Sequence, residues 1–321
     1  MTSTPRIVSL LPSATEIVCR VGGREGLVGV SHECDFPAGV GALPPLTRPR
    51  FEMPRASDAI DRAVRETLRD ALAVYEVDID RLQQLEPDLV VTQDLCDVCA
   101  VSLNDVTEAL RTLARDDVEV VSLKPTVLSD VWSDVRRVGE AIGRPELGAS
   151  AAAELEERCR AVAARAAQLP TRPSVLSIEW LSPVMIGGTW MPELIELAGG
   201  TPMVTRPGEH APTLEMEALA ALDPDVVLIK PCGFELERTF EELDLLASHL
   251  PWRQWRAVRE GRVHIADGNA FFNRPGPRLV ESLEILAACV HPQEFRDLRR
   301  RHAESFVGVD PDLAIRAAVA S

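Results

Sequence analysis

A ten-residue junction pattern occurs twice in the chain, and it constrains the fold more than any other feature of the sequence. Leu82-Gln-Gln-Leu-Glu-Pro87-Asp-Leu-Val-Val91 matches Leu219-Ala-Ala-Leu-Asp-Pro224-Asp-Val-Val-Leu228, and the two prolines lie 137 positions apart. Proline disfavours the helical conformation in the residue before it, so each copy predicts a short helix, the proline and then a buried strand. The repeat favours two lobes of related architecture. The alternative is a common helix-to-strand junction that the chain uses twice.

Short apolar strands alternate with helical segments around each copy of this repeat. Such alternation predicts mainly parallel sheets covered by helices on both faces, an α/β fold. Ser13-Ala-Thr-Glu16 has the pattern of a capping box and predicts a helix that continues to about Val21. The expected strands are 6–11, 27–30, 89–91 and 118–123 in the first lobe, and 174–178, 226–229 and 262–266 in the second.

One long helical segment separates the two lobes. Gly148 to Leu169 is rich in Ala, Glu and Arg with apolar residues at helical spacing, and Pro170 and Pro173 follow it. Such a helix is a stiff connection, unlike a Gly/Ser hinge. We therefore expect an N-terminal lobe over 1–147, a linking helix over 148–170 and a C-terminal lobe over 171–321, whose tail from Pro277 to Phe306 is helical.

The charge balance excludes two classes of partner. The 321 residues include 34 basic and 50 acidic side chains, a net charge of −16, which disfavours both nucleic acid and anionic lipid surfaces. Seven cysteines cannot all pair within one chain, which favours a reducing compartment. The sequence offers neither a transmembrane run nor room for a signal peptide before the first strand, so we expect a cytoplasmic protein as written, and a periplasmic or cell-surface one only if the true start lies upstream.

The loops after the expected strands hold most of the unusual residues. In open α/β sheets ligands bind outside the carboxyl ends of the strands, so these loops define a candidate cleft. Six aromatic residues in them favour a large, flat, apolar ligand, although aromatic side chains that merely cover the sheet ends are the alternative. The loops are 12–16, 31–36, 92–99, 179–190, 230–234 and 267–278, and the aromatic residues are Phe36, Trp180, Trp190, Phe234, Phe271 and Phe272.

A histidine and four cysteines in these loops raise the possibility of metal chemistry. Cys96 and Cys99 form a CxxC, which is half a zinc site, a redox dithiol or a pair with a packing or ligand-contact role. His32 is the best candidate for an axial cobalt or iron ligand, with Glu33 as the residue that would orient it, and a loop histidine that only forms hydrogen bonds is the alternative. Cys34 and Cys232 are the remaining cysteine candidates. Arg274 and Arg278 would bind ligand carboxylates or amides, or else form helix caps and salt bridges.

Sequence signatures of common enzyme classes are absent. The chain contains no GxxxxGK[ST], GxSxG or HExxH, and neither of its two lysines, Lys124 and Lys230, lies in such a context. The aromatic residues of the loops favour a non-enzymatic binding protein. The rival from another class is a metal- or thiol-dependent enzyme that uses the histidine and cysteines of the loops, with zinc or iron as the less favoured bound metals.

Five of these segments together resemble the cobalamin-binding branch of the ABC-transporter substrate-binding proteins, and the similarity covers nearly the whole chain. The resemblance implies a class III periplasmic-binding-protein fold, in which two Rossmann-like lobes joined by one rigid helix hold a corrinoid, haem or iron-siderophore. The segments are Leu11-Pro-Ser-Ala-Thr-Glu16, Gly29-Val-Ser-His-Glu-Cys-Asp35, Thr92-Gln-Asp-Leu-Cys-Asp-Val-Cys-Ala100, Pro231-Cys-Gly-Phe234 and Phe272-Asn-Arg-Pro-Gly-Pro-Arg278.

The resemblance also implies a ligand and a partner. The expected ligand is cobalamin or another corrinoid, with haem or an iron-siderophore as the alternative, and the expected form is a monomer. Acidic residues seven positions before each junction proline, Asp80 and Glu217, would dock onto an ABC permease, although Asp is shorter than the Glu usual in the family. The expected ligand-binding residues are His32, Phe36, Gln93, Cys96, Cys99, Trp180, Trp190, Cys232, Phe234, Phe271, Phe272 and Arg274.

Overall fold

The computed structural model describes residues 4–69, 74–93, 117–243 and 254–309, and these residues form two compact units. Unit 1 comprises 1–54, 62–156 and 275–277, and unit 2 comprises 55–61, 157–274 and 278–321. The expectation of an α/β fold with two mainly parallel sheets is confirmed. The division differs in detail from the expected lobes, because residues 55–61 cluster with unit 2 and the boundary falls inside the long helix.

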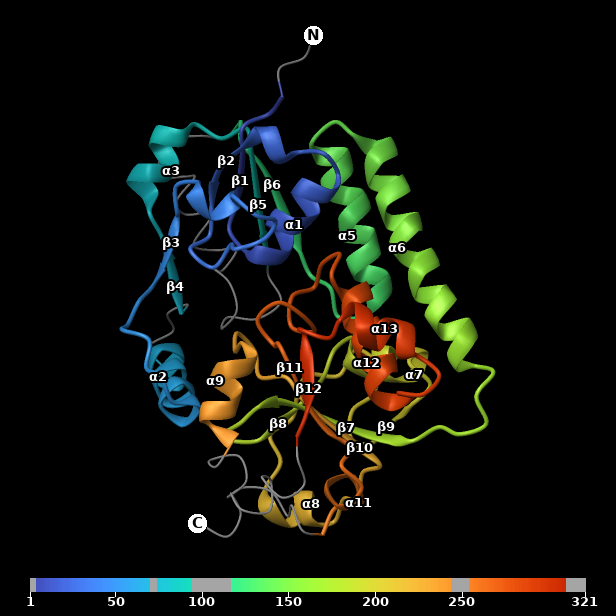
Figure 1. Cartoon of the computed structure of the whole chain (residues 1–321). Helices are drawn as coiled ribbons and strands as arrows, with labels where there is room; N and C mark the ends of the chain where they lie inside the picture. The colour runs from blue at the N-terminus through green and yellow to red at the C-terminus, as the bar shows by residue number, and fades with distance from the viewer. Residues whose placement is uncertain (1–3, 70–73, 94–116, 244–253, 310–321) are drawn as a thin grey trace. The chain divides into compact units, whose positions relative to one another are not determined.

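Unit 1 is built on a four-stranded parallel sheet with the order β2-β1-β5-β6 (Figure 1). A two-stranded antiparallel sheet, β3-β4, accompanies it. The elements are β1 (Ile7–Ser9), α1 (Pro12–Arg20), β2 (Leu27–Val30), β3 (Thr47–Pro49), α2 (Ser57–Arg69), β4 (Tyr75–Val77), α3 (Ile79–Leu85), β5 (Leu89–Gln93), β6 (Glu119–Leu123), α5 (Leu128–Ala141) and α6 (Pro145–Ala166), of which α2 and α6 are divided between the units.

Both faces of this sheet are buried, as expected for parallel strands. Val8 and Val90 are paired in register and lie on one face of the sheet. They pack there with Leu82 of α3, with Leu46, which directly precedes β3, and with Tyr75, the first residue of β4. Helices α1 and α5 pack together, and α5 also contacts β6. The core thereby fixes the carboxyl ends of β1, β2 and β5, from which the loops of interest start.

Unit 2 repeats this strand arrangement and adds to it. Its parallel strands run in the order β9-β7-β10-β11, and two antiparallel strands are added, β8 beside β7 and β12 beside β11. The elements are β7 (Ser174–Trp180), β8 (Met185–Ile186), α7 (Met191–Leu197), β9 (Thr201–Pro202), α8 (Met216–Ala220), β10 (Val226–Ile229), α9 (Leu236–Glu241), α11 (Arg256–Arg259), β11 (Val263–Ala266), α12 (Leu279–Val290), α13 (Arg296–Arg301) and β12 (Phe306–Gly308).

The repeated Pro-Asp junction has the same structure in both units. In unit 1 the carboxylate of Asp88 accepts a hydrogen bond of 2.8 Å from the backbone N–H of Arg6, next to the first residue of β1. In unit 2 the carboxylate of Asp225 accepts one of 2.8 Å from the backbone N–H of Ser174, the first residue of β7. Each aspartate therefore joins the start of its own strand to the start of the first strand of its unit.

Ion pairs attach the second half of α6 to the other helices of unit 2. Arg158 contacts Glu281 and Glu284 of α12 at 2.9 and 3.0 Å. Arg165 contacts Asp297 of α13 at 2.8 Å and lies 4.4 Å from the centre of the Phe295 ring. This part of the long helix is thus fixed to the rest of unit 2 by ion pairs at two arginines that lie about two turns apart.

Two local predictions are wrong. Helix α1 begins at Pro12, which occupies its first turn, and no side chain caps it, so Ser13 does not form the expected capping box; its buried hydroxyl has no hydrogen-bond partner in the described part of the chain. The C-terminal tail is not helical throughout, because Phe306 begins β12. No described helix is both long enough and apolar enough to span a membrane.

Candidate ligand-binding site

The carboxyl ends of the parallel strands carry the candidate residues in each unit. In unit 1, β2 leads to Ser31 and His32, and β5 ends at Gln93. In unit 2, β7 ends at Trp180, β10 leads to Lys230, and β11 leads to the loop that starts at Asp267.

A hydroxyl of Thr47 organises the end of β2. Thr47 Oγ1 lies 2.7 Å from His32 Nδ1 and 2.9 Å from Ser31 Oγ, and it accepts the backbone N–H of His32 at 3.1 Å. The imidazole packs against the Tyr75 ring, with ring centres 5.2 Å apart. Thr47 and Tyr75 belong to the small β3-β4 sheet, so that sheet holds the histidine in place.

The exposed His32 side chain has a free ring nitrogen. Among the described residues, Nδ1 forms a hydrogen bond with Thr47 and Nε2 forms none. Burial lowers the pKa of His32, and the nearby Glu33 carboxylate only partly opposes this shift. The imidazole is therefore neutral at pH 7. When Nδ1–H donates to Thr47, the Nε2 lone pair is available to a metal.

Glu33 does not orient His32, contrary to the expectation from the sequence. Its carboxylate accepts a hydrogen bond of 2.8 Å from the Tyr75 hydroxyl, while Thr47 contacts the imidazole. Glu33 acts on the His32 imidazole through its charge and contacts it only indirectly, by way of the Tyr75 ring that packs against it. Thr47 and Tyr75 were not identified from the sequence because they lie 15 and 43 positions beyond His32 on strands that the sequence did not predict.

The other predicted residues of unit 1 differ in accessibility. Phe36 is 45% exposed, whereas Cys34 is buried with its Sγ 3.1 Å from Thr15 Oγ1. Gln93 is buried at the end of β5. Cys96 and Cys99 lie outside the described residues.

Unit 2 contains a fully buried charge at the end of β10. The ammonium of Lys230 is 0% exposed and donates hydrogen bonds to Glu179 Oε2 at 2.7 Å and to Asn273 Oδ1 at 2.9 Å. The Asn273 amide in turn donates to the backbone oxygens of Lys230 and Gly268 at 3.0 and 2.8 Å. This network was missed from the sequence, although a lysine directly after a buried strand, in a chain with only two lysines, is a usable signal.

Three aromatic residues predicted to contact ligand are buried and engaged within unit 2. Phe234 lies edge-on to Trp180, with ring centres 5.4 Å apart, and the Arg238 guanidinium lies 3.8 Å from its ring centre. Trp190 donates from Nε1 to the backbone oxygen of Phe272 at 2.7 Å. Trp190, Phe234 and Phe272 thus have the packing role that was the alternative reading of these residues, whereas Trp180 is half-buried.

Backbone strain accompanies this packing. Phe272 has φ 68° and Thr189, beside Trp190, has φ 51°, a conformation that costs a non-glycine residue about 1 kcal/mol or more. The backbone N–H of Phe272 donates to Ser282 Oγ at 2.8 Å, which helps to hold it there. Such strain is typical of loops whose shape has a function.

The remaining residues of these loops are more accessible. Cys232 is an exposed cysteine outside any disulfide, and Phe271 is half-buried with the Arg278 guanidinium 5.7 Å from its ring centre. Arg274 is half-buried and donates to Asn269 Oδ1 at 2.8 Å. Within the described ranges, no group of three or more His, Cys, Asp or Glu residues could hold a metal ion.

The two acidic residues predicted to contact a permease occupy matching positions. Asp80 lies in the first turn of α3 and Glu217 in the first turn of α8, and both are exposed. Each follows an exposed apolar residue, Ile79 and Met216, and each of these is 38% exposed. The junction repeat therefore includes a surface feature as well as a structural one.

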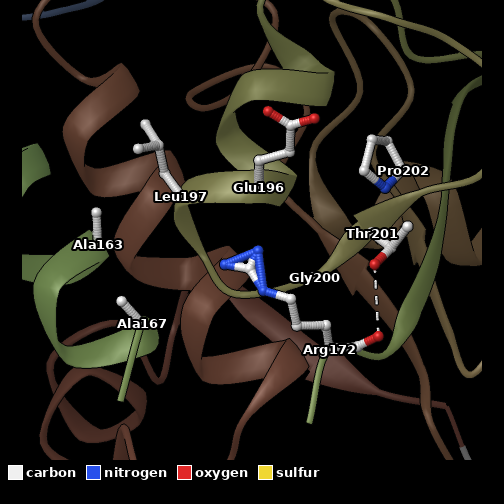
Figure 2. Close-up of a pocket in the computed structure, with 8 residues that line it drawn as sticks. All are labelled: Ala163, Ala167, Arg172, Glu196, Leu197, Gly200, Thr201 and Pro202. Carbon is white, nitrogen blue, oxygen red and sulfur yellow. Dashed lines mark hydrogen bonds between the residues drawn. The ribbon is translucent and has the colours of Figure 1, made fainter. Parts of the chain in front are cut away.

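A surface pocket of about 470 Å³ lies elsewhere in unit 2, as Figure 2 shows. It is near the amino ends of β7 and β9, because Thr201 pairs with Ser174 and Arg172 comes just before β7. Its position is opposite to the carboxyl ends that carry the loops described above. Its lining residues are Ala163, Ala167, Arg172, Glu196, Leu197, Gly200, Thr201 and Pro202.

Two α/β units with polar and aromatic loops at the carboxyl ends of their parallel sheets define a ligand-binding protein. The family model for periplasmic binding proteins matches residues 7–270, which is most of the chain. The chain belongs to this periplasmic binding protein family, whose members are non-enzymatic substrate-binding proteins, and it is a substrate-binding protein of the ABC-transporter type.

Relatives of known name cover nearly the whole chain at low identity. The vitamin B12-binding protein of Vibrio parahaemolyticus is 22% identical over 305 residues, which cover 92% of this chain and 91% of the relative. The cobalamin-binding protein of Halobacterium salinarum is 24% identical over 290 residues, which cover 89% of this chain and 69% of the relative.

Solved structures confirm the class III fold. A periplasmic haem-binding protein from Pseudomonas aeruginosa has a TM-score of 0.67 at 23% identity, with 90% of this chain and 93% of that chain covered. The periplasmic vitamin B12-binding protein of Vibrio cholerae has a TM-score of 0.63 at 18% identity, with 92% and 98% covered. The fold is thus shared by binders of different macrocycles.

Proposed function

We propose that this protein binds a corrinoid, cobalamin or a close relative, for an ABC importer. The observation that carries the proposal is His32, an exposed and neutral imidazole with Nδ1 held by Thr47 and Nε2 without a hydrogen-bond partner among the described residues. A ring nitrogen prepared in this way suits the axial position of a metal held in a flat macrocycle. The relatives named as vitamin B12- or cobalamin-binding proteins support a corrinoid in preference to haem.

The residues of this chain would act as follows. In the tautomer in which His32 Nδ1–H donates to Thr47 Oγ1, the Nε2 lone pair is free to bind a metal, while Tyr75 packs against the ring. In unit 1 the exposed Phe36 would offer apolar surface to a macrocycle. In unit 2 the partly exposed Trp180 and Phe271 would offer apolar surface, and Cys232 and Arg274 would offer polar contacts to amide side chains.

The test is an absorption titration of the purified protein with hydroxocobalamin. We expect saturable binding and a shift of the cobalt-corrin bands in the wild type, and loss of the shift in His32→Ala. His210→Ala is the matched control, because His210 is also exposed, and it should behave like the wild type. Binding of haem without binding of hydroxocobalamin would overturn the corrinoid proposal, and an unchanged shift in His32→Ala would remove the axial role.

We also propose that Asp80 and Glu217 are contacts to the permease. Their support is the matching position in the first turns of α3 and α8, each beside an exposed apolar residue. Asp80→Ala and Glu217→Ala should leave ligand affinity unchanged and weaken ligand-loaded binding to the cognate permease in proteoliposomes. Equal permease binding by the variants and the wild type would contradict the assignment.

A further inference from the structure

The most unusual group in unit 2 is the buried ammonium of Lys230. A charge is costly to bury unless it is paired and hydrogen-bonded, and Lys230 is fully buried with two partners, Glu179 and Asn273. Glu179 lies near the end of β7, Lys230 directly follows β10, and Asn273 lies in the loop after β11. One side chain therefore connects the carboxyl ends of three neighbouring strands.

The two loops joined by Lys230 are also interlocked through their backbones. The backbone N–H of Gly268 donates to the Phe234 oxygen at 2.9 Å, and that of Asn269 donates to the same oxygen at 3.1 Å. A Cβ at Gly268 would lie 2.0 Å from the Pro231 oxygen, so only glycine permits this approach. The loop also contains the strained Phe272, so its shape must be imposed by its contacts.

We propose that Lys230 is a positioning residue that presets the loops 230–234 and 267–274 for ligand. The proposal rests on the proposed binding function, since these loops bear Cys232, Phe271 and Arg274. Without the ammonium, Asn273 loses a charged hydrogen bond and the strained loop loses its central support. A loop ordered before binding avoids the entropic cost of ordering it around the ligand, so the effect of Lys230 is on affinity as well as on folding.

The test combines amide hydrogen exchange of the ligand-free protein with hydroxocobalamin titration. In Lys230→Met we expect exchange in both loops to rise about tenfold, the change that corresponds to one lost hydrogen bond to a charged group, with little change in β10. Affinity should fall by about the same factor. Lys124→Met, at the only other lysine of the chain, which is exposed in unit 1, is the matched control for exchange and should leave exchange in the two loops of unit 2 at the wild-type rate.

Two further variants separate positioning from stability. The double variant Glu179→Met/Lys230→Met replaces the ion pair by apolar side chains, so it should regain the urea midpoint of unfolding but not the loop protection or the affinity. Asn273→Ala leaves the Lys230–Glu179 pair intact but removes the amide contacts to the Lys230 and Gly268 oxygens, so it should raise exchange chiefly in 267–274. Wild-type exchange in the loops of Lys230→Met and Asn273→Ala would overturn the proposal. Because exchange is measured without ligand, failure of the wild type to bind hydroxocobalamin would refute the corrinoid proposal and leave this test intact.

Discussion

The carboxyl ends of the two sheets are stabilised in different ways. In unit 1 a neutral hydroxyl, Thr47 Oγ1, contacts His32 and Ser31. In unit 2 a buried ammonium, that of Lys230, contacts Glu179 and Asn273. A hydroxyl can exchange donor and acceptor roles, so the first arrangement lets the imidazole change its protonated nitrogen, whereas the second fixes the backbone of two loops. One sheet end thus offers an adjustable ligand and the other a rigid surface.

The largest expected effect comes from removing the partner of the buried charge. Among the described residues, Glu179→Met leaves the Lys230 ammonium with the Asn273 oxygen as its one side-chain partner, and it should lower the free energy of unfolding by about 3 kcal/mol. Urea unfolding measures this loss. Glu237→Met, at an exposed glutamate of α9, is the control and should cost little. Equal losses in the two variants would show that the Lys230 network contributes no more to the free energy of unfolding than an exposed glutamate does.

The two units should also respond to acid in opposite directions. Burial raises the pKa of Asp134 in unit 1 to about 6, against the opposing effect of Arg137. In unit 2 burial also acts to raise the pKa of Glu284, but hydrogen bonds from His302 and Arg158 outweigh this effect and lower the pKa to about 2. Between pH 6 and 4 Asp134 binds more protons in the folded state than in the unfolded state. The contribution of Asp134 to stability therefore rises as pH falls from about 6 to 4. The contribution of Glu284 is lost as pH falls from about 4.5 to 2, and each effect is about 3 kcal/mol.

Unfolding midpoints between pH 2 and 7 test this contrast. Asp134→Asn should flatten the dependence between pH 4 and 6 only, and Glu284→Gln should flatten it between pH 2 and 4.5 only. The contrast fails if either variant changes the profile in the window assigned to the other.

A smaller effect is expected at the Thr47 hydroxyl of unit 1. Thr47→Val keeps the shape of the side chain but leaves the backbone N–H of His32 and the Ser31 hydroxyl without this partner, which should cost about 1–2 kcal/mol. It should also alter the cobalt bands of bound hydroxocobalamin, because His32 loses its orientation. Thr201→Val, at an exposed threonine of β9, controls for the substitution. Unchanged bands with Thr47→Val would mean that Thr47 does not direct His32.

The smallest expected difference lies between the two Pro-Asp junctions. Asp225 accepts hydrogen bonds from the backbone and hydroxyl of Ser174 and pairs with Arg256 at 2.8 Å, whereas the exposed Asp88 caps Arg6 alone. We expect Asp225→Asn to cost about 1 kcal/mol and Asp88→Asn about half of that in urea unfolding. A larger cost at Asp88 would reverse the ranking.

The parallel strands and their junctions were predictable because local chemistry determines them. Strands 27–30 and 226–229 have the expected bounds, and Pro87 and Pro224 separate helix from strand as expected. Short antiparallel additions such as β8 and β12 were not predicted, because their pairing depends on partners distant in the sequence. The Ser13 motif failed because Pro12 at the first turn makes a helix start that needs no side-chain cap.

The site was predictable only at the level of loops. The rule that loops at carboxyl strand ends bear the ligand placed His32 and Trp180 at strand ends, but it could not tell exposed rings from buried ones such as Phe234. That distinction depends on tertiary contacts, here with Arg238 and Trp180. Thr47 acts through contacts with residues distant in the sequence, which no local pattern predicts. Lys230 stands out locally as a lysine directly after a buried strand, but its partners Glu179 and Asn273 are distant in the sequence.

The burial of Lys230 has a practical consequence for labelling. With only two lysines in the chain and one of them shielded, an amine-reactive dye should attach at Lys124 and at the amino terminus. Lys124 is exposed and follows β6 directly, at the carboxyl end of the unit 1 sheet. A fluorophore placed there would report from the same end of the sheet as His32, without chemical damage to the loops of unit 2.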